Sequence, residues 1–175
     1  PYIDNCLNYS FTSKIQSLVI AFLVHNLTNT ESSKIILKLF RHFNKSGNCK
    51  LTKKELIDGL CKYREIDEVE DKVNSIFLML DSDNNGFIEF EEFLRACIDK
   101  KEVLTEDNMK FAFKFLDNNN TGTLNANKIM QAFLTEPNPI LEEAFHETLV
   151  ELDDNRDGII GYDRFKLLML KTMQK

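Results

Sequence analysis

Residues 81–92 carry oxygen-bearing side chains at alternating positions of a twelve-residue segment. Carboxylates or an amide stand at positions 1, 3, 5 and 12, and Gly86 at position 6 permits the left-handed bend that turns the chain around an ion. A hard divalent cation such as Ca²⁺ takes about six to eight oxygens, which here would come from side chains, one backbone carbonyl and a water. The spacing therefore predicts a calcium site. Its ligands would be Asp81, Asp83, Asn85, the backbone carbonyl of Phe87, and Glu92.

The same pattern recurs in outline at three other places, 36 or 37 residues apart. The further copies begin at Asn44, Asp117 and Asp153, and each is flanked by large apolar residues at matching positions. Such flanks predict a helix entering and a helix leaving every loop. The eighth loop position is also apolar in all four copies: Leu51, Ile88, Leu124 and Ile160. We expect four helix–loop–helix units that pair into two lobes, with the eighth positions pairing between neighbouring loops.

The three other loops depart from the full ligand set. Position 12 is Lys128 in the third loop and Arg164 in the fourth, which removes two carboxylate oxygens and adds a cation that repels a metal ion. The first loop keeps Glu55 but has Cys49 in place of glycine, and Thr52 with Glu55 forms a helix-capping pattern. The sequence leaves open whether the loops at 44–55, 117–128 and 153–164 bind calcium.

Composition excludes several classes of protein. The chain has 175 residues, 43% of them apolar, and a net charge of −6, which argues against nucleic-acid binding. The apolar run Leu18–Val24 is much shorter than the ~20 residues of a membrane span. Four scattered cysteines suggest free thiols and a cytoplasmic protein. Because the chain starts at Pro1, we expect a piece of a longer protein, and membrane anchoring through an upstream segment is left open.

These observations predict an all-α fold with two lobes and a long N-terminal helix. We place the boundaries at 1–33 for an N-terminal helical segment, 34–100 for the first pair of units and 101–175 for the second. The segment 11–27 carries apolar residues at helical spacing on more than one face. We therefore expect it to be a helix that the lobes grip as an internal partner. Thr105 and Asn138 are expected to cap later helices, with Pro139 at the first position of the second one.

Residues 34–175 resemble the EF-hand proteins of the calmodulin type, on the strength of the repeated loops and their flanks. The preceding segment, from Phe11 through Val24 to Phe40, makes the layout similar to the regulatory region of plant- and protist-type calcium-dependent protein kinases. In that family a junction helix follows the kinase domain and precedes four EF-hands. The resemblance implies a calcium-binding domain that controls an attached, ATP-binding Ser/Thr kinase by calcium-dependent rearrangement, with that kinase domain as its partner.

The sequence departs from the family pattern in two respects, and it also allows an alternative function. Only one loop is complete, and residues 1–33 contain Lys14 as their one lysine or arginine, although junction helices are usually basic. The chain itself has no kinase motif and no predicted catalytic residue, so we expect no catalysis from it alone. The alternative is an EF-hand adaptor, similar to a light chain or to calcineurin B, that clamps a partner helix largely without calcium.

Overall fold

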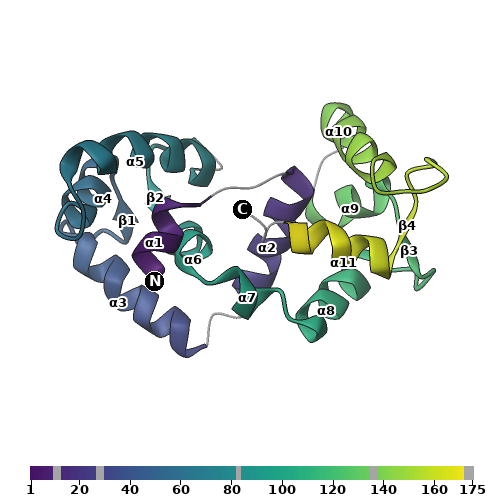
Figure 1. The fold of residues 1–175 in the computed structure, drawn as a ribbon, viewed down its shortest axis with the longest axis horizontal. Helices are drawn as coiled ribbons and strands as arrows, with labels where there is room; N and C mark the ends of the chain where they lie inside the picture. Colours follow the sequence, from purple (N-terminus) through teal and green to yellow (C-terminus); the bar gives the residue numbers. More distant parts are fainter. Residues whose placement is uncertain (10–12, 27–29, 82–83, 135–137, 172–175) are drawn as a thin grey trace. The chain divides into compact units, whose positions relative to one another are not determined.

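The computed structural model describes residues 1–9, 13–26, 30–81, 84–134 and 138–171. It divides into two compact units. The first contains the described residues of 1–10 and 24–99, and the second those of 11–23 and 100–175. Both units are mainly helical (Figure 1), which confirms the all-α fold with two paired lobes. Within the described residues, every helix is too short or too polar to cross a membrane.

The first unit holds two helix–loop–helix motifs and a short helix from the N-terminus. Its elements are α1 (Tyr2–Leu7), α3 (Glu31–Phe43), β1 (Lys50–Leu51), α4 (Lys53–Leu60), α5 (Ile66–Leu80), β2 (Ile88–Glu89) and α6 (Phe90–Cys97). Thr30 begins α3 by accepting a hydrogen bond from the backbone of Ser33 at 3.2 Å. Thr52 and Glu55 form the predicted capping box at the start of α4.

The second unit repeats this arrangement. Its elements are α2 (Lys14–Asn26, up to residue 23), α7 (Lys100–Val103), α8 (Glu106–Leu116), β3 (Thr123–Leu124), α9 (Ala126–Phe133), α10 (Pro139–Val150), β4 (Ile160–Gly161) and α11 (Tyr162–Leu170). The predicted caps are confirmed: Thr105 accepts from Asn108 N at 3.3 Å, and Asn138 accepts from Leu141 N at 3.1 Å.

A two-stranded antiparallel sheet joins the loops within each unit. Leu51 pairs with Ile88 in the first sheet, and Leu124 pairs with Ile160 in the second. All four side chains are at most 1% exposed. The predicted pairing of the eighth loop positions is therefore confirmed, and it fixes the two loops of a unit side by side.

The apolar flanks of the repeat form the core of each unit. In the first unit, Phe93 packs edge-on against Phe40 and Phe43, with ring centroids 5.6 and 5.9 Å apart. In the second, Phe113 and Phe165 make the equivalent contact at 5.5 Å. Burying such rings is worth about 1.5–3 kcal/mol each before ordering costs, so the helices bracketing a loop hold it in place.

The helix predicted for 11–27 is found as α2, with one difference at its start. Residues 11, 12 and 27 lie outside the described part of the chain, and Ser13 precedes the helix, which begins at Lys14. Ser13 N donates to Gln16 Oε1 at 2.9 Å, and Gln16 N donates to Ser13 Oγ at 3.4 Å. This reciprocal capping sets the start of the helix at Lys14, whereas apolar periodicity alone suggested an earlier start.

Candidate metal centre

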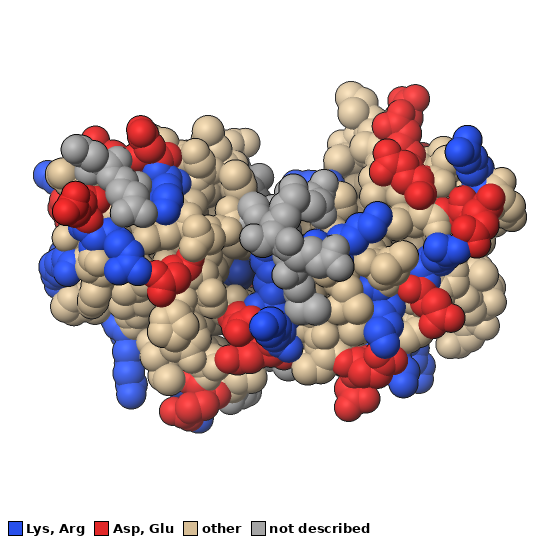
Figure 2. Space-filling view, viewed as in Figure 1, with Lys and Arg blue, Asp and Glu red and all other residues tan. Residues whose placement is uncertain are grey.

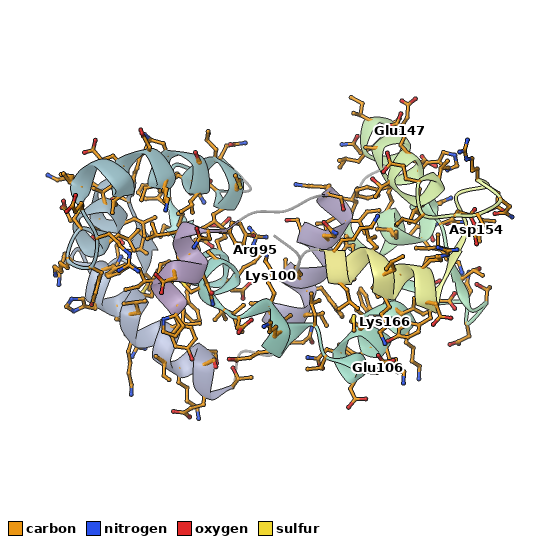
Figure 3. The ribbon with its side chains drawn as sticks, viewed as in Figure 1. Arg95, Lys100, Glu106, Glu147, Asp154 and Lys166 are labelled. Carbon is orange, nitrogen blue, oxygen red and sulfur yellow. The ribbon has the colours of Figure 1, made fainter. Side chains whose placement is uncertain are left out.

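The loop at 81–92 lies between α5 and α6. The side chain of Arg95 on α6 (Figure 3) is 8% exposed, and its Nη2 donates to the carbonyl of Leu80 at 3.3 Å. Leu80 is the last residue of α5, where helix carbonyls lack partners within the helix. Arg95 on α6 is thus bonded to the last residue of α5, which immediately precedes the loop.

Asp81, at position 1, is held by the backbone of its own loop. Its Oδ1 accepts from Asn85 N and its Oδ2 from Gly86 N, each at 2.9 Å. Asn84 and Gly86 have positive φ angles of 54° and 80°, the left-handed conformation that brings those N–H groups around. The carboxylate is thereby oriented in advance of any ion, and the residue is only 9% exposed.

The remaining predicted ligands are partly described. Asn85 Oδ1 accepts from Phe87 N at 2.8 Å, and Glu92 Oε2 accepts from Glu89 N at 3.0 Å. Asp83 lies outside the described residues. Among the residues that are described, no three His, Cys, Asp or Glu side chains form a cluster able to hold a metal ion. Asp81, Asn85 and Glu92 have the oxygen donors, and the loop has the positive φ angles, of a calcium loop. Their assignment as calcium ligands stays a prediction.

The first loop is closed by its own side chains. Asn44 Nδ2 donates to Asn48 Oδ1 at 3.1 Å and to the carbonyl of Lys50 at 2.6 Å, which joins positions 1, 5 and 7. Glu55 accepts from Ser46 N at 2.9 Å and from Thr52 N at 3.0 Å. Partial burial raises the pKa of Glu55, but these backbone hydrogen bonds outweigh it and lower the pKa to about 2. The carboxylate is engaged in closing the loop and capping α4.

The third loop contains a cation supplied by the chain. Lys128 Nζ donates to Asp117 Oδ1 at 2.6 Å, to the carbonyl of Thr123 at 2.7 Å and to Thr121 Oγ1. Asp117 also accepts from Gly122 N at 2.7 Å. The hydrogen bond from Lys128 is the main reason that the pKa of Asp117 lies well below its ordinary value. From its charge, we expected Lys128 to repel a metal ion. In the structure its ammonium group lies among the oxygens of the loop.

The fourth loop differs from the third in where its cation lies. Arg164 pairs with Asp154 at position 2, and the Asp154 side chain is 85% exposed (Figure 3). Asp153 Oδ2 accepts from Asp157 N at 2.9 Å, as position 1 does in the second loop. The fourth loop lacks a carboxylate at position 12, as the third loop does. Because Arg164 pairs with Asp154, its guanidinium does not fill the centre of the loop as the ammonium of Lys128 does.

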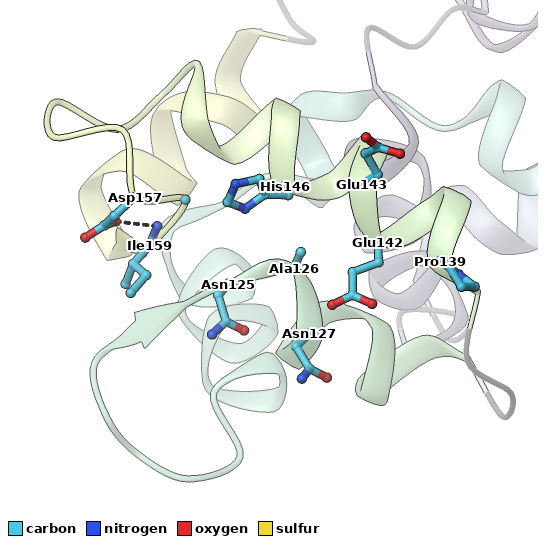
Figure 4. Close-up of a pocket in the computed structure, with 10 residues that line it drawn as sticks. Asn125, Ala126, Asn127, Pro139, Glu142, Glu143, His146, Asp157 and Ile159 are labelled. Carbon is cyan, nitrogen blue, oxygen red and sulfur yellow. Dashed lines mark hydrogen bonds between the residues drawn. The ribbon is translucent and has the colours of Figure 1, made fainter.

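A groove lies beside the fourth loop in the second unit. It lies between α9, α10 and the segment 157–159 (Figure 4), and a Cβ added at Gly158 would come within 2.5 Å of His146 Nδ1. Its lining residues are Asn125, Ala126, Asn127, Pro139, Glu142, Glu143, His146, Asp157, Gly158 and Ile159. The glycine lets α10 approach the loop closely. The hydrogen bond from Ile159 N to Asp157 Oδ1, 2.8 Å long, keeps that carboxylate within the loop.

Contacts of α1 in the first unit were missed by the sequence analysis. Asn5 Nδ2 donates to the carbonyl of Cys97 at 3.0 Å, and Cys6 is fully buried. Burial raises the pKa of Tyr9, while the guanidinium of Arg95 beside it acts in the opposite direction. A six-residue helix is too short to be stable alone, so its periodicity gave little signal. The apolar residues Ile3 and Leu7 at helical spacing were the available hint.

Contacts of α2 in the second unit include an aromatic cluster around Phe22. The ring of Phe22 lies against Phe111, Phe115 and Phe133, with centroids 5.5, 4.3 and 6.1 Å away. Gln16 is fully buried, and its Nε2 donates to the carbonyl of Leu168 at 2.7 Å. Glu106 adds an exposed connection between α8 and α11 through Tyr162 and Lys166 (Figure 3). Over the face drawn in Figure 2, acidic and basic side chains are interspersed on each unit.

Four helix–loop–helix units in two sheet-linked pairs define a calmodulin-like EF-hand domain. The chain belongs to the EF-hand family: the EF-hand domain pair matches residues 33–98 and again residues 106–170. Its cofactor is Ca²⁺.

The curated relatives are calcium-dependent protein kinases. Calcium-dependent protein kinase 4 of Plasmodium berghei and of Plasmodium falciparum are each 31% identical over 113 residues, which is 59% of this chain and 21% of the relative. Calcium-dependent protein kinase 5 of Plasmodium falciparum is 30% identical over 86 residues, 49% of this chain and 15% of the relative. The chain therefore spans about a fifth of the length of these relatives or less. It is an EF-hand calcium-binding domain that resembles their regulatory region.

Proposed function

We propose that this chain is the calcium-responsive regulatory domain of a longer protein and controls an attached Ser/Thr kinase. The ion would be held between Asp81 and Glu92, with Asp83, Asn85 and the carbonyl of Phe87 as further ligands. The likeness to the Plasmodium kinases supports the attached kinase. The four free cysteines support a location in a reducing compartment such as the cytoplasm.

The observation that carries this proposal is the double role of α6. This helix bears Glu92, the last predicted ligand, and it also contacts α1 through Cys97 and the adjoining Tyr9 through Arg95. Calcium binding in sensor EF-hands changes the angle between the two helices of a hand. A shift of α6 relative to α5 would therefore alter its contacts with α1. In the family that this chain resembles, the kinase domain precedes this region, so such a change would act on that domain.

The boundaries proposed for this arrangement are those of the repeat: 1–33 as the junction segment, 34–100 and 101–175 as the two EF-hand pairs. The helix at 11–27 would serve as an internal partner of the lobes. The contacts of Phe22 with Phe111 and Phe115 in the second unit support that role. Apolar burial dominates these contacts, so salt should affect them little.

The test combines calcium titration with hydrogen–deuterium exchange. We expect calorimetry on the chain to find an ion with a dissociation constant of about 10⁻⁷ to 10⁻⁵ M, and Glu92→Gln to lose it. Glu91→Gln, which changes the neighbouring and 61% exposed carboxylate, is the matched control and should keep it. Calcium should change exchange in α1 of the native chain and leave it unchanged in Glu92→Gln. Undiminished binding by Glu92→Gln would refute the ligand assignment.

A second candidate function is an adaptor that clamps a partner helix with little calcium dependence. The closed first and third loops favour it, because Asn44 and Lys128 hold those loops together from within. The two functions differ in α1: an adaptor would show calcium-independent exchange there. Kinase motifs in the sequence upstream of Pro1 would decide for the first.

A further inference from the structure

The side chain of Lys128 uses its full bonding capacity inside the third loop. A lysine ammonium has three N–H donors and no acceptor. Those of Lys128 go to Asp117 Oδ1, Thr121 Oγ1 and the carbonyl of Thr123. The Lys128 side chain is 13% exposed and that of Asp117 5%. This charge pair is largely buried and fully satisfied, unlike exposed pairs such as Arg164 with Asp154.

The three acceptors occupy positions 1, 5 and 7 of the loop. In a calcium-binding loop these positions supply two side-chain oxygens and the backbone carbonyl that ligate the ion. Lys128 stands at position 12, where a calcium loop has its bidentate glutamate. The loop therefore lacks the glutamate ligand, and the ammonium group of Lys128 binds the oxygens that would otherwise ligate a calcium ion.

The backbone of the third loop matches that of the complete second loop. Asn120 and Gly122 have φ angles of 51° and 77°, compared with 54° and 80° at Asn84 and Gly86. Asp117 accepts from the backbone of Thr121 and Gly122 as Asp81 does from Asn85 and Gly86. The third loop therefore has the conformation of a calcium loop around an ammonium group.

We propose that Lys128 is the built-in cation of the third loop, which keeps this loop folded at every calcium concentration and excludes a metal ion from it. The consequence reaches α2. Lys128 lies in the first turn of α9, and Phe133 at the end of the same helix contacts Phe22. Through Leu124 and Ile160 the loop also supports the fourth loop. The second unit would then hold α2 permanently, and calcium regulation would be confined to the first unit.

Two substitutions test the proposal in the full chain. Lys128→Met keeps the aliphatic stem and removes the charge, leaving Asp117 buried without its cation. Without calcium, it should lower the melting temperature of the second unit by about 10 °C and increase amide exchange in the segment 117–124. Calcium should not restore either property. Lys128→Glu should be destabilised similarly in a calcium chelator, but calcium should restore its stability and calorimetry should count one more bound ion.

The matched control is Arg164→Met, which removes the position-12 cation of the fourth loop. Because Arg164 pairs with an exposed carboxylate, its loss should shift the melting temperature by no more than about 2 °C. Equal shifts for Lys128→Met and Arg164→Met would overturn the proposal. So would calcium-dependent protection of 117–128 in the native chain. If Lys128→Met does not fold, Lys128→Glu still decides: a second unit that folds with calcium supports the proposal, and one that does not contradicts it.

This proposal is separable from the regulatory function. Its readouts lie in the second unit, whereas those of Glu92→Gln lie in the first. A failure of Glu92→Gln to abolish calcium binding would leave the result for Lys128 unchanged, and the reverse also holds.

Discussion

The ring of Phe22 on α2 stacks on that of Phe115 on α8, with centroids 4.3 Å apart and planes inclined by 21°. Phe111, one turn earlier on α8, extends the same contact at 5.5 Å. Phe111 and Phe115 remain 50% and 43% exposed even with Phe22 in place. Without Phe22, these two rings would form a larger apolar surface open to water, which favours association or aggregation.

Replacing Phe22 by alanine should therefore destabilise the second unit. We expect a loss of about 2–3 kcal/mol in its free energy of unfolding, because a partly buried ring and its stacking contacts are removed. Denaturant unfolding followed by circular dichroism would measure it. Leu78→Ala is the control, since Leu78 is 84% exposed and its loss should cost less than about 0.5 kcal/mol. Equal, small effects of the two substitutions would show that the Phe22 contacts contribute little to the stability of this unit.

Replacing Arg164 by glutamate should create a calcium site in the fourth loop. Asp153, Asn155 and Asp157 already stand at positions 1, 3 and 5, and Arg164 turns away to Asp154. The new carboxylate supplies the missing oxygens, and we expect a second ion with a dissociation constant near ~10⁻⁵ M. Arg164→Gln should gain no ion, because loss of the cation alone adds no strong ligand. A titration of Arg164→Glu that still ends at one ion would place the defect in the loop geometry instead.

The stabilising effect of Glu55 should depend on pH. Its pKa in the folded chain is about 2, below the ordinary 4.5, so the ionised form stabilises the folded state above pH 4.5 and this contribution is lost as pH falls toward 2. Glu55→Gln should cost about 1 kcal/mol at pH 7, with the difference from the native chain shrinking below pH 4.5. Urea unfolding between pH 7 and 3 would measure it. Glu31→Gln, at a 78% exposed side chain, is the control, and an equal loss at pH 7 for the two variants would contradict the role of Glu55.

Cys49 should be a position at which glycine stabilises the protein. It occupies position 6 of the first loop with a φ of 62°, a conformation that costs a non-glycine residue about 1 kcal/mol. Cys49→Gly should raise the free energy of unfolding of the first unit by about 0.5–1 kcal/mol. Cys61→Gly should lower it by a similar amount, because Cys61 has a φ of −60° and gains nothing from glycine. Thermal melts of both variants would give the signs.

Much of the fold was predictable because the repeat is encoded in local spacing. The loops, their apolar flanks and the pairing of Leu124 with Ile160 all follow from residue types at fixed intervals. The N-caps at Thr105 and Asn138 were equally local. The short α1 and its contact with Cys97 were not predictable in this way. A six-residue helix is specified by what it packs against, and Asn5 and Cys97 are 92 residues apart in the chain.

Residue types and spacing alone showed that one loop has a complete set of predicted calcium ligands and that position 12 of the third and fourth loops carries a cation. They did not show where the side chains of those cations lie. Lys128 turns inward to three loop oxygens, whereas Arg164 turns outward to Asp154. A long side chain has many rotamers, and its direction depends on which acceptors the folded backbone presents within reach. Only the tertiary structure therefore distinguished a loop that is filled from one that merely lacks a ligand.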